Sequence, residues 1–156
     1  MRVRRVVTGH NANGMSYVKI NDFATNRTAR RTGHESRLVW MTDNTPVTNE
    51  DKEDMGARNI GRPPPENGTI FRMIEIEPGV SADAHFTETI DYVIVISGEM
   101  DMELDTETIR LTAGDVIVQR GTRHNWVNNG SEPCRFAAIL IDAKNMKRKE
   151  SKNYGE

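Results

Sequence analysis

Seven short strand-like runs between residues 70 and 142 constrain the fold of this chain more than any other feature. Turn-forming residues separate them, among them Pro78-Gly79, Gly98 and Gly114. Short strands about 8–12 residues apart, with turn signals between them, are typical of an antiparallel sandwich or barrel. The runs are IFRMIEIE (70–77), DYVIVIS (91–97), MDMEL (100–104), TIRL (108–111), DVIVQ (115–119), HNWVN (124–128) and RFAAILID (135–142). The sequence therefore predicts an all-β fold.

The runs differ in how many faces they can bury. MDMEL alternates apolar and acidic residues, as expected of a strand with one face in water. YVIVI and FAAILI are apolar at successive positions. We therefore expect the strands that contain YVIVI and FAAILI to lie beneath a second layer or a partner subunit.

The first half of the chain is less regular. RVRRVVTG and MSYVKIND predict edge strands around the turn-prone HNANG, and SRLVWM (36–41) predicts another strand. Residues 43–69 contain acidic residues and three consecutive prolines, which favour a surface loop with one helical turn near 50–54. We expect one structural domain: an arm and loop (1–69) packed on a barrel core (70–143), followed by a charged tail (144–156).

Composition limits the partners and the compartment. The 156 residues carry 21 Lys and Arg against 23 Asp and Glu, without a long basic stripe, so nucleic acid is not expected as a partner. Cys134 is the only cysteine, which excludes an intrachain disulfide framework and fits a reducing cytoplasm. The apolar runs are too short to span a bilayer, so we expect no membrane association.

Two segments carry the residues with chemical potential. In PGVSADAHFTETIDYVIVISGEM (78–100), a glycine is followed after five residues by His85, then by Thr87, Asp91 and a second glycine. In GDVIVQRGTRHNWVN (114–128), glycines and an aspartate precede His124, and Asn128 follows it. Both segments fall on predicted strands, so the sequence places two imidazoles and a carboxylate on two neighbouring hairpins.

These segments resemble the two sequence motifs of the cupin superfamily, although Gln119 stands where proline is usual. The resemblance implies a jelly-roll β-barrel of the RmlC-like type with an N-terminal strand arm. It also implies that the metal-binding positions of such barrels fall on His85, Thr87, Asp91 and His124. Thr87 replaces a histidine and is a poor ligand beside imidazole, and Asp91 is one methylene shorter than the usual glutamate.

Three interpretations of this site stay open. His85, Asp91 and His124 could form a facial triad for Fe, Mn, Ni or Zn, as in a metal-dependent dioxygenase. Alternatively, the same three residues could perform acid–base chemistry, with or without a divalent metal, because burial moves the pKa values of His and Asp. The second interpretation predicts a lyase or isomerase that catalyses dehydration, decarboxylation or a keto–enol rearrangement. A non-catalytic ligand-binding cupin is the remaining alternative.

The substrate would be a small oxygenated metabolite, carboxylated or, as the resemblance to single-domain cupins implies, of a polyketide type. Thr87, Arg72, Tyr92 and Trp126 are the candidate substrate-binding residues. Arg72 could hold a carboxylate if its face of the strand points inward, and Trp126 shares a face with His124 by the period of two.

The two other histidines, His10 and His34, lie in polar, turn-like contexts and are expected to be exposed. The resemblance also implies that an N-terminal strand adds to a neighbouring subunit's sheet, so that a homodimer is expected.

Overall fold

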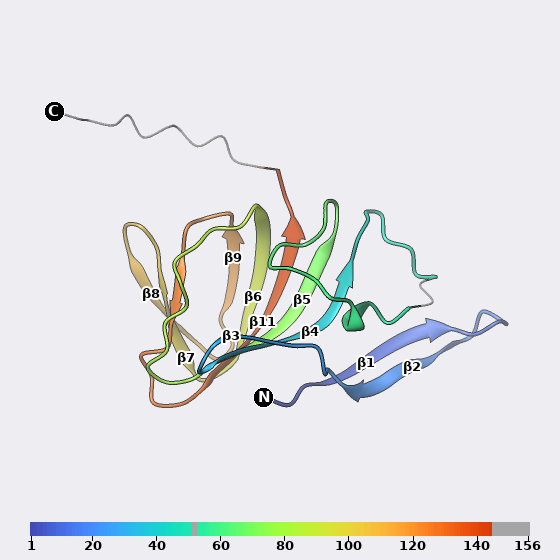
Figure 1. The fold of residues 1–156 in the computed structure, drawn as a ribbon, viewed down its shortest axis with the longest axis horizontal. Helices are drawn as coiled ribbons and strands as arrows, with labels where there is room; N and C mark the ends of the chain where they lie inside the picture. Colours follow the sequence, from blue (N-terminus) through green and yellow to red (C-terminus); the bar gives the residue numbers. More distant parts are fainter. Residues whose placement is uncertain (51–52, 145–156) are drawn as a thin grey trace.

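Two antiparallel sheets face each other and a separate hairpin extends beside them in the computed structural model, which describes residues 1–50 and 53–144 (Figure 1). In chain order the strands are β1 (Arg4–His10), β2 (Ser16–Phe23), β3 (Arg27–Arg31), β4 (His34–Thr42), β5 (Thr69–Ile76), β6 (Thr89–Ser97), β7 (Glu99–Glu103), β8 (Thr108–Thr112), β9 (Val116–Arg120), β10 (Asn125–Val127) and β11 (Cys134–Asp142). The only helical element of the described residues is a 3-10 turn, η1 (Met55–Ala57). The predicted all-β barrel is confirmed.

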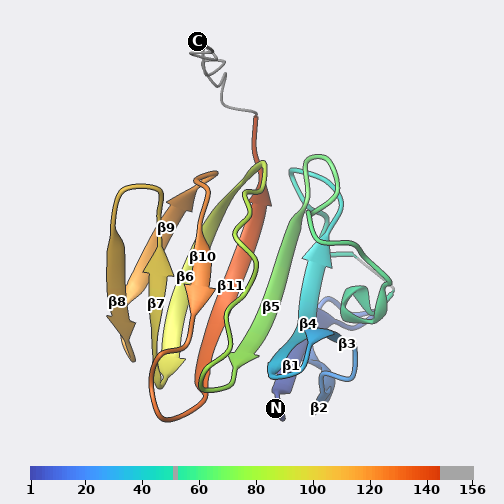
Figure 2. The ribbon, with the colours of Figure 1, turned by 60° about the vertical axis from the view of Figure 1, so that its left-hand side comes forward.

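The larger sheet has the order β3-β4-β5-β11-β6-β9, and the smaller one has the order β10-β7-β8. Figure 2 shows the smaller sheet lying in front of the β6–β11 half of the larger one. β4 pairs with β5 along most of its length, so the large sheet includes strands that precede residue 70. β3, which the sequence did not predict, forms the edge of that sheet.

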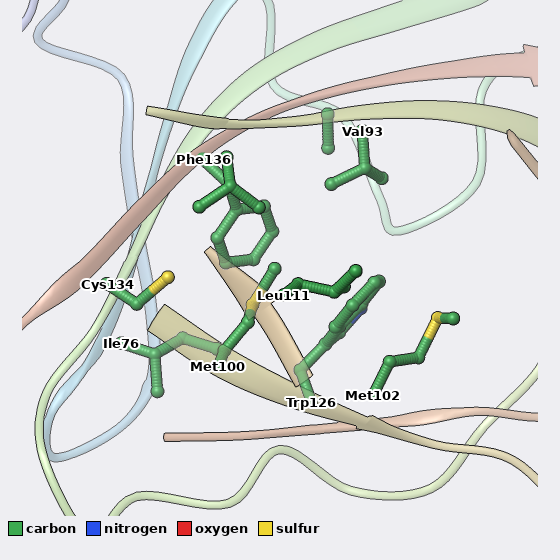
Figure 3. Close-up of a cluster of buried hydrophobic side chains, with 10 residues drawn as sticks. Ile76, Val93, Met100, Met102, Leu111, Trp126, Cys134 and Phe136 are labelled. Carbon is green, nitrogen blue, oxygen red and sulfur yellow. The ribbon is translucent and has the colours of Figure 1, made fainter. Parts of the chain in front are cut away.

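The core fills the space between the two sheets (Figure 3). β6 alternates strictly, because Val93 and Val95 are buried while Tyr92, Ile94 and Ile96 are exposed on the outer face. The expectation that β6 buries both faces is therefore not met within the described chain, and a partner subunit over this face remains a prediction. The buried cluster comprises Ile76, Val93, Val95, Met100, Met102, Leu111, Trp126, Cys134, Phe136 and Ala138.

The β1–β2 hairpin, predicted as two edge strands, is fixed to the barrel by a buried arginine. Arg5 is 8% exposed and donates hydrogen bonds to the carboxylates of Asp22 and Asp54, at distances of 2.6–3.1 Å. Asp54 also caps η1 by accepting from the backbone N–H of Gly56. The helical turn thus begins just after the expected position, and residues 51–52 lie outside the described residues.

Two further sequence expectations concern the ends and the surface of the chain. Of the predicted tail (144–156), everything after residue 144 lies outside the described residues. No helix in the described ranges has the length and apolar character needed to cross a membrane.

A glycine in the tight turn between β6 and β7 gives the first prediction. Gly98 has a φ of 74°, and a Cβ there would lie 2.5 Å from the carbonyl oxygen of Pro133. Gly114, with a φ of 95°, has no atom within 4 Å of such a Cβ. Left-handed backbone alone costs roughly 1–2 kcal/mol per residue, so Gly98→Ala should lower the free energy of unfolding more than Gly114→Ala does.

Urea denaturation of both variants measures this difference. Equal losses in the two variants would show that the close approach of Pro133 does not constrain the turn.

Candidate functional site

A cavity of about 580 Å³ opens between the two sheets. Its walls come mainly from the large sheet, through strands β3–β6, β9 and β11. The loop around Gly61, the segment before β6 and the β10 region of the small sheet complete them. Its apolar wall includes Ile74, Phe136 and Trp126. Its polar uncharged or acid–base side chains are Thr28, His34, Ser36, Asp83, His85, Thr87, Asp91, Gln119 and His124. A largely apolar hollow with a few convergent polar groups is the usual form of a small-molecule site.

His85 and His124 form the centre of this site. Each donates its backbone N–H to the other's carbonyl oxygen, at 3.0 and 2.9 Å, in an isolated antiparallel bridge. Directly opposite residues of such a bridge carry their side chains on the same face. The two rings accordingly lie 4.6 Å apart between centroids. This bridge aligns the segment containing His85 with His124, which directly precedes β10.

Backbone carbonyls set the tautomers of both rings. The Nδ1 atoms of His85 and His124 lie 2.7 Å from the carbonyl oxygen of Asp83 and 2.9 Å from that of Thr122, respectively. Because a carbonyl oxygen only accepts, Nδ1 must carry the hydrogen in both rings. The Nε2 atom of each neutral ring is then free to accept a hydrogen bond or a proton.

Gln119 links Asp91 to His124. The two residues Asp91 and Gln119 lie opposite each other on β6 and β9, so that both side chains point inward. The amide Nε2 of Gln119 donates to Asp91 Oδ2 at 2.9 Å and lies 3.3 Å from His124 Nε2. Gln119 was not among the predicted site residues, although a polar residue at the end of an otherwise apolar run was a usable signal.

Burial changes the pKa values of these groups in opposite directions. Loss of solvation lowers the pKa of His124 to about 4 and lowers that of His85. Burial raises the pKa of Asp91, and this effect exceeds the opposing contributions of the Thr89 and Gln119 side chains. At neutral pH both imidazoles are therefore uncharged, and the carboxyl group holds a proton more readily than an ordinary aspartate does.

The donor atoms do not form the expected metal triad. Asp91 Oδ1 and Gln119 Oε1 are buried and have no hydrogen-bond partner among the described residues. The hydrogen bond to Asp91 comes from Gln119 and not from an imidazole. Thr87 Oγ1 lies 2.6 Å from Thr89 Oγ1 and is engaged there. Across residues 1–50 and 53–144, no group of three His, Cys, Asp or Glu side chains is arranged to hold a metal ion.

The other predicted site residues divide into two groups. Arg72 and Trp126 point into the cavity, and the Trp126 ring packs edge-on against His124 with centroids 5.4 Å apart. Tyr92 does not belong to the site, because it follows Asp91 directly on β6 and so lies on the outer face, 44% exposed. His10 is exposed as expected, whereas His34 is half-buried and lines the cavity, so its predicted exposure was wrong.

Three arginines also line the cavity without having been predicted: Arg30, Arg31 and Arg62. Their sequence contexts are a polar edge strand and a proline-rich loop.

Cys134 is buried, and burial raises the pKa of its thiol to about 11, so the thiolate needed for nucleophilic chemistry is disfavoured.

Fold and site together define a double-sheet β-barrel with a small-molecule cavity, and comparison with known proteins assigns its family. A model of the cupin domain matches residues 72–141. The cupin-domain-containing oxidoreductase virC of Hypocrea virens is 36% identical over 152 residues, covering 92% of this chain and 77% of its own. Phomopsin biosynthesis cluster protein C' of Diaporthe leptostromiformis is 32% identical, covering 90% and 78%. The chain belongs to the cupin family.

A solved structure supports the fold independently. The double-stranded β-helix protein of unknown character from Klebsiella pneumoniae aligns with a TM-score of 0.54 at 18% identity, covering 76% of this chain and 85% of that one. At this identity the likeness establishes the barrel alone.

The low pKa of His124 predicts how stability depends on pH. The folded state takes up a proton on this ring only near pH 4, whereas the unfolded state does so near 6.5. The unfolded state therefore binds more protons between these values, and stability falls as the pH drops through them. Between pH 7 and pH 5 this effect amounts to roughly 2 kcal/mol, and His124→Gln should remove that part of the loss.

Urea denaturation midpoints at pH 7 and pH 5 provide the measurement. His10→Gln, which changes an exposed histidine, should retain the full pH dependence. An unchanged pH dependence in His124→Gln would contradict the burial argument.

Proposed function

We propose that this cupin is a lyase or isomerase that moves a proton within a small oxygenated substrate bound between the sheets. The observation that carries the proposal is the connected set of His124, Gln119 and Asp91. Burial shifts the pKa values of Asp91 and His124. Asp91 Oδ1 and Gln119 Oε1 are buried without a hydrogen-bond partner among the described residues. Shifted pKa values on titratable groups in a cavity are typical of catalytic sites.

Asp91 is the proposed base for a carbon-bound proton. Its Oδ1 atom has no partner among the described residues, whereas Oδ2 accepts from Gln119. When Oδ1 removes a proton from a carbon next to a carbonyl group, the electron pair of the C–H bond forms an enolate. The raised pKa of Asp91 makes this transfer less unfavourable than it would be with an ordinary aspartate.

The fate of that proton distinguishes the two reaction types. Its return to a different carbon or to the enolate oxygen completes an isomerisation. Its transfer to a departing hydroxyl group releases water and completes a dehydration. The unprotonated Nε2 atom of His85 would accept a hydrogen bond from a substrate hydroxyl group, because its Nδ1 atom is already committed to a backbone carbonyl. The Nε2 atom of His124 is already engaged by Gln119.

Gln119 is the proposed positioning residue. Its two amide hydrogens point at Asp91 Oδ2 and His124 Nε2, so that it favours an ionised carboxylate and an unprotonated Nε2 at the same time. The carboxylate that acts as base is thereby aligned, and the imidazole is held in the accepting form.

An oxidoreductase is the second candidate, and the name of the relative virC favours it. Such a reaction would need a redox partner, which in cupins is often a bound metal. The donor atoms near His85 and His124 do not form a three-ligand site in the described chain, so no step of the proposed mechanism passes through a metal.

Hydrogen–deuterium exchange tests the proton-transfer proposal before the natural substrate is known. Small hydroxyketones and ketoacids are incubated with the protein in D2O, and deuterium at carbons next to the carbonyl is followed by NMR. General acid–base catalysis contributes about 10²–10⁴-fold to rate, so Asp91→Asn should lower the exchange rate at least about a hundredfold. Asp105→Asn, which changes an exposed aspartate, should not alter it.

Exchange that proceeds at the full rate in Asp91→Asn would remove this carboxylate from the mechanism. Gln119→Leu gives a second readout, because Gln119 lowers the pKa of Asp91. The carboxyl titration of Asp91, followed by 13C NMR, should move to higher pH in that variant.

Metal content separates the two candidate functions. Elemental analysis of protein purified without added metal should find no stoichiometric transition metal if the proton-transfer proposal holds. A near-stoichiometric ion in the wild type and in His10→Ala, lost in His124→Ala, would support the oxidoreductase instead.

A further inference from the structure

Arg72 is a buried cation without a carboxylate partner in the described chain. Its side chain comes from β5, is 7% exposed and lines the cavity. One terminal nitrogen donates to the carbonyl oxygen of Gly61 at 2.8 Å, and the other lies 3.5 Å from the Ser36 hydroxyl oxygen. Burial lowers the pKa of Arg72, and the charge of Arg30 lowers it further.

Arg5 shows how the same fold treats a buried arginine that has a structural role. It is buried to the same degree, yet two carboxylates, Asp22 and Asp54, neutralise it. Burying a charge is unfavourable unless a partner of opposite charge compensates for it. Arg72 lacks that compensation from residues 1–50 and 53–144, which leaves its charge available to a group from outside the described residues.

Two more arginines at the cavity add positive charge. Arg30 and Arg62 line its wall, and among residues 1–50 and 53–144 neither forms an ion pair. Arg31, by contrast, is paired with Asp83. The charge of Arg62 lowers the pKa values of His34, His85 and His124, so its field extends across the cavity.

We propose that the cavity binds small organic carboxylates, with the acid group on Arg72 and the carbon skeleton extending toward His124 and Asp91. This inference rests on the proposed function and names its substrate class. A guanidinium group binds a carboxylate through two parallel hydrogen bonds. Only two of the five N–H groups of Arg72 have a protein acceptor, so donors remain for such a ligand.

The surroundings favour a carboxylate over a phosphate. Phosphate sites in proteins commonly use a helix N-terminus, where several backbone N–H groups converge. The described part of this chain has no α-helix, and the loop beside Arg72 presents the carbonyl oxygen of Gly61. The planar guanidinium of Arg72 matches the two oxygens of a carboxylate, which lie in one plane.

The sheet geometry limits the size of the ligand. Arg72 lies opposite Ala138 on β11, which lies opposite Val93 on β6, and Asp91 is two residues further along β6. Neighbouring strands are about 4.8 Å apart and residues rise about 3.3 Å along a strand, so the Cα atoms of Arg72 and Asp91 are about 12 Å apart. Both side chains reach inward across this gap, which leaves room for a molecule with its acid group a few bonds from the reacting carbon.

Binding of matched probes tests the inference without turnover. Benzoate, benzamide and phenyl phosphate have the same apolar ring and differ in the group offered to Arg72. Calorimetric titration measures their affinities. Quenching of tryptophan fluorescence in a Trp40→Phe variant, which leaves Trp126 as the only tryptophan, reports whether they enter the cavity. Losing a charge-assisted hydrogen bond weakens binding by about tenfold or more, so benzoate should bind at least about tenfold more tightly than benzamide.

Variants assign the effect to the arginines. Arg72→Met should abolish the preference for benzoate over benzamide, and Arg62→Gln should reduce it without disturbing a buried position. Arg120→Gln, which changes an exposed arginine outside the cavity, should keep the wild-type preference. Melting temperatures verify that each variant is folded. If Arg72→Met does not fold, the benzoate preference of Arg62→Gln tests the inference.

Equal affinities for benzoate and benzamide in the wild type would overturn the inference, as would a preference that survives in both Arg72→Met and Arg62→Gln. Tighter binding of phenyl phosphate than of benzoate would overturn the assignment to carboxylates. Because these measurements need no reaction, Asp91→Asn should still prefer benzoate. Failure of the proton-transfer proposal would appear in the exchange assay, and failure of the carboxylate site would appear in these binding measurements. The two failures are therefore distinguishable.

Discussion

The reciprocal backbone hydrogen bonds between His85 and His124 are the contact on which the site depends. The two residues are far apart in the chain, and the segment that carries His85 is joined to the small sheet by only a few such bonds. One of the flanking residues, Asn128, is fully buried and donates its amide hydrogens to the carbonyl oxygens of Ile76 and Glu132. The second sequence motif therefore contributes a structural asparagine as well as an imidazole. Asn128 connects the loop that follows β10 to the end of β5.

The sequence predicted the parts of the site that follow from local periodicity. His124 and Trp126 share a face because they are two residues apart, and their rings are in contact in the structure. The same rule should have excluded Tyr92, since its neighbour Asp91 points inward. Adjacency along a strand separates side chains, and a prediction based on nearness in sequence fails there.

Residues that reach the cavity through strand pairing were not accessible to the same reasoning. Gln119 enters the site because β9 places it opposite Asp91, and this register is a tertiary property. Arg30 and His34 lie on β3 and at the start of β4. β3 has almost no buried residue, so its sequence RTARR lacks the apolar alternation that identifies a strand. Its position follows from pairing with β4, which is an edge contact that composition does not encode.

The positive charge of the cavity adds to the effect of burial on its imidazoles. Burial lowers the pKa of His124 most, and the charge of Arg62 lowers it further. A carboxylate bound at the arginines would oppose the second effect, because a negative charge favours the protonated form of a nearby imidazole. Its binding would therefore raise the pKa values of His85 and His124 from their low resting values toward neutrality. The site would then gain proton affinity when an acidic substrate is present, and without one its imidazoles would remain uncharged hydrogen-bond acceptors.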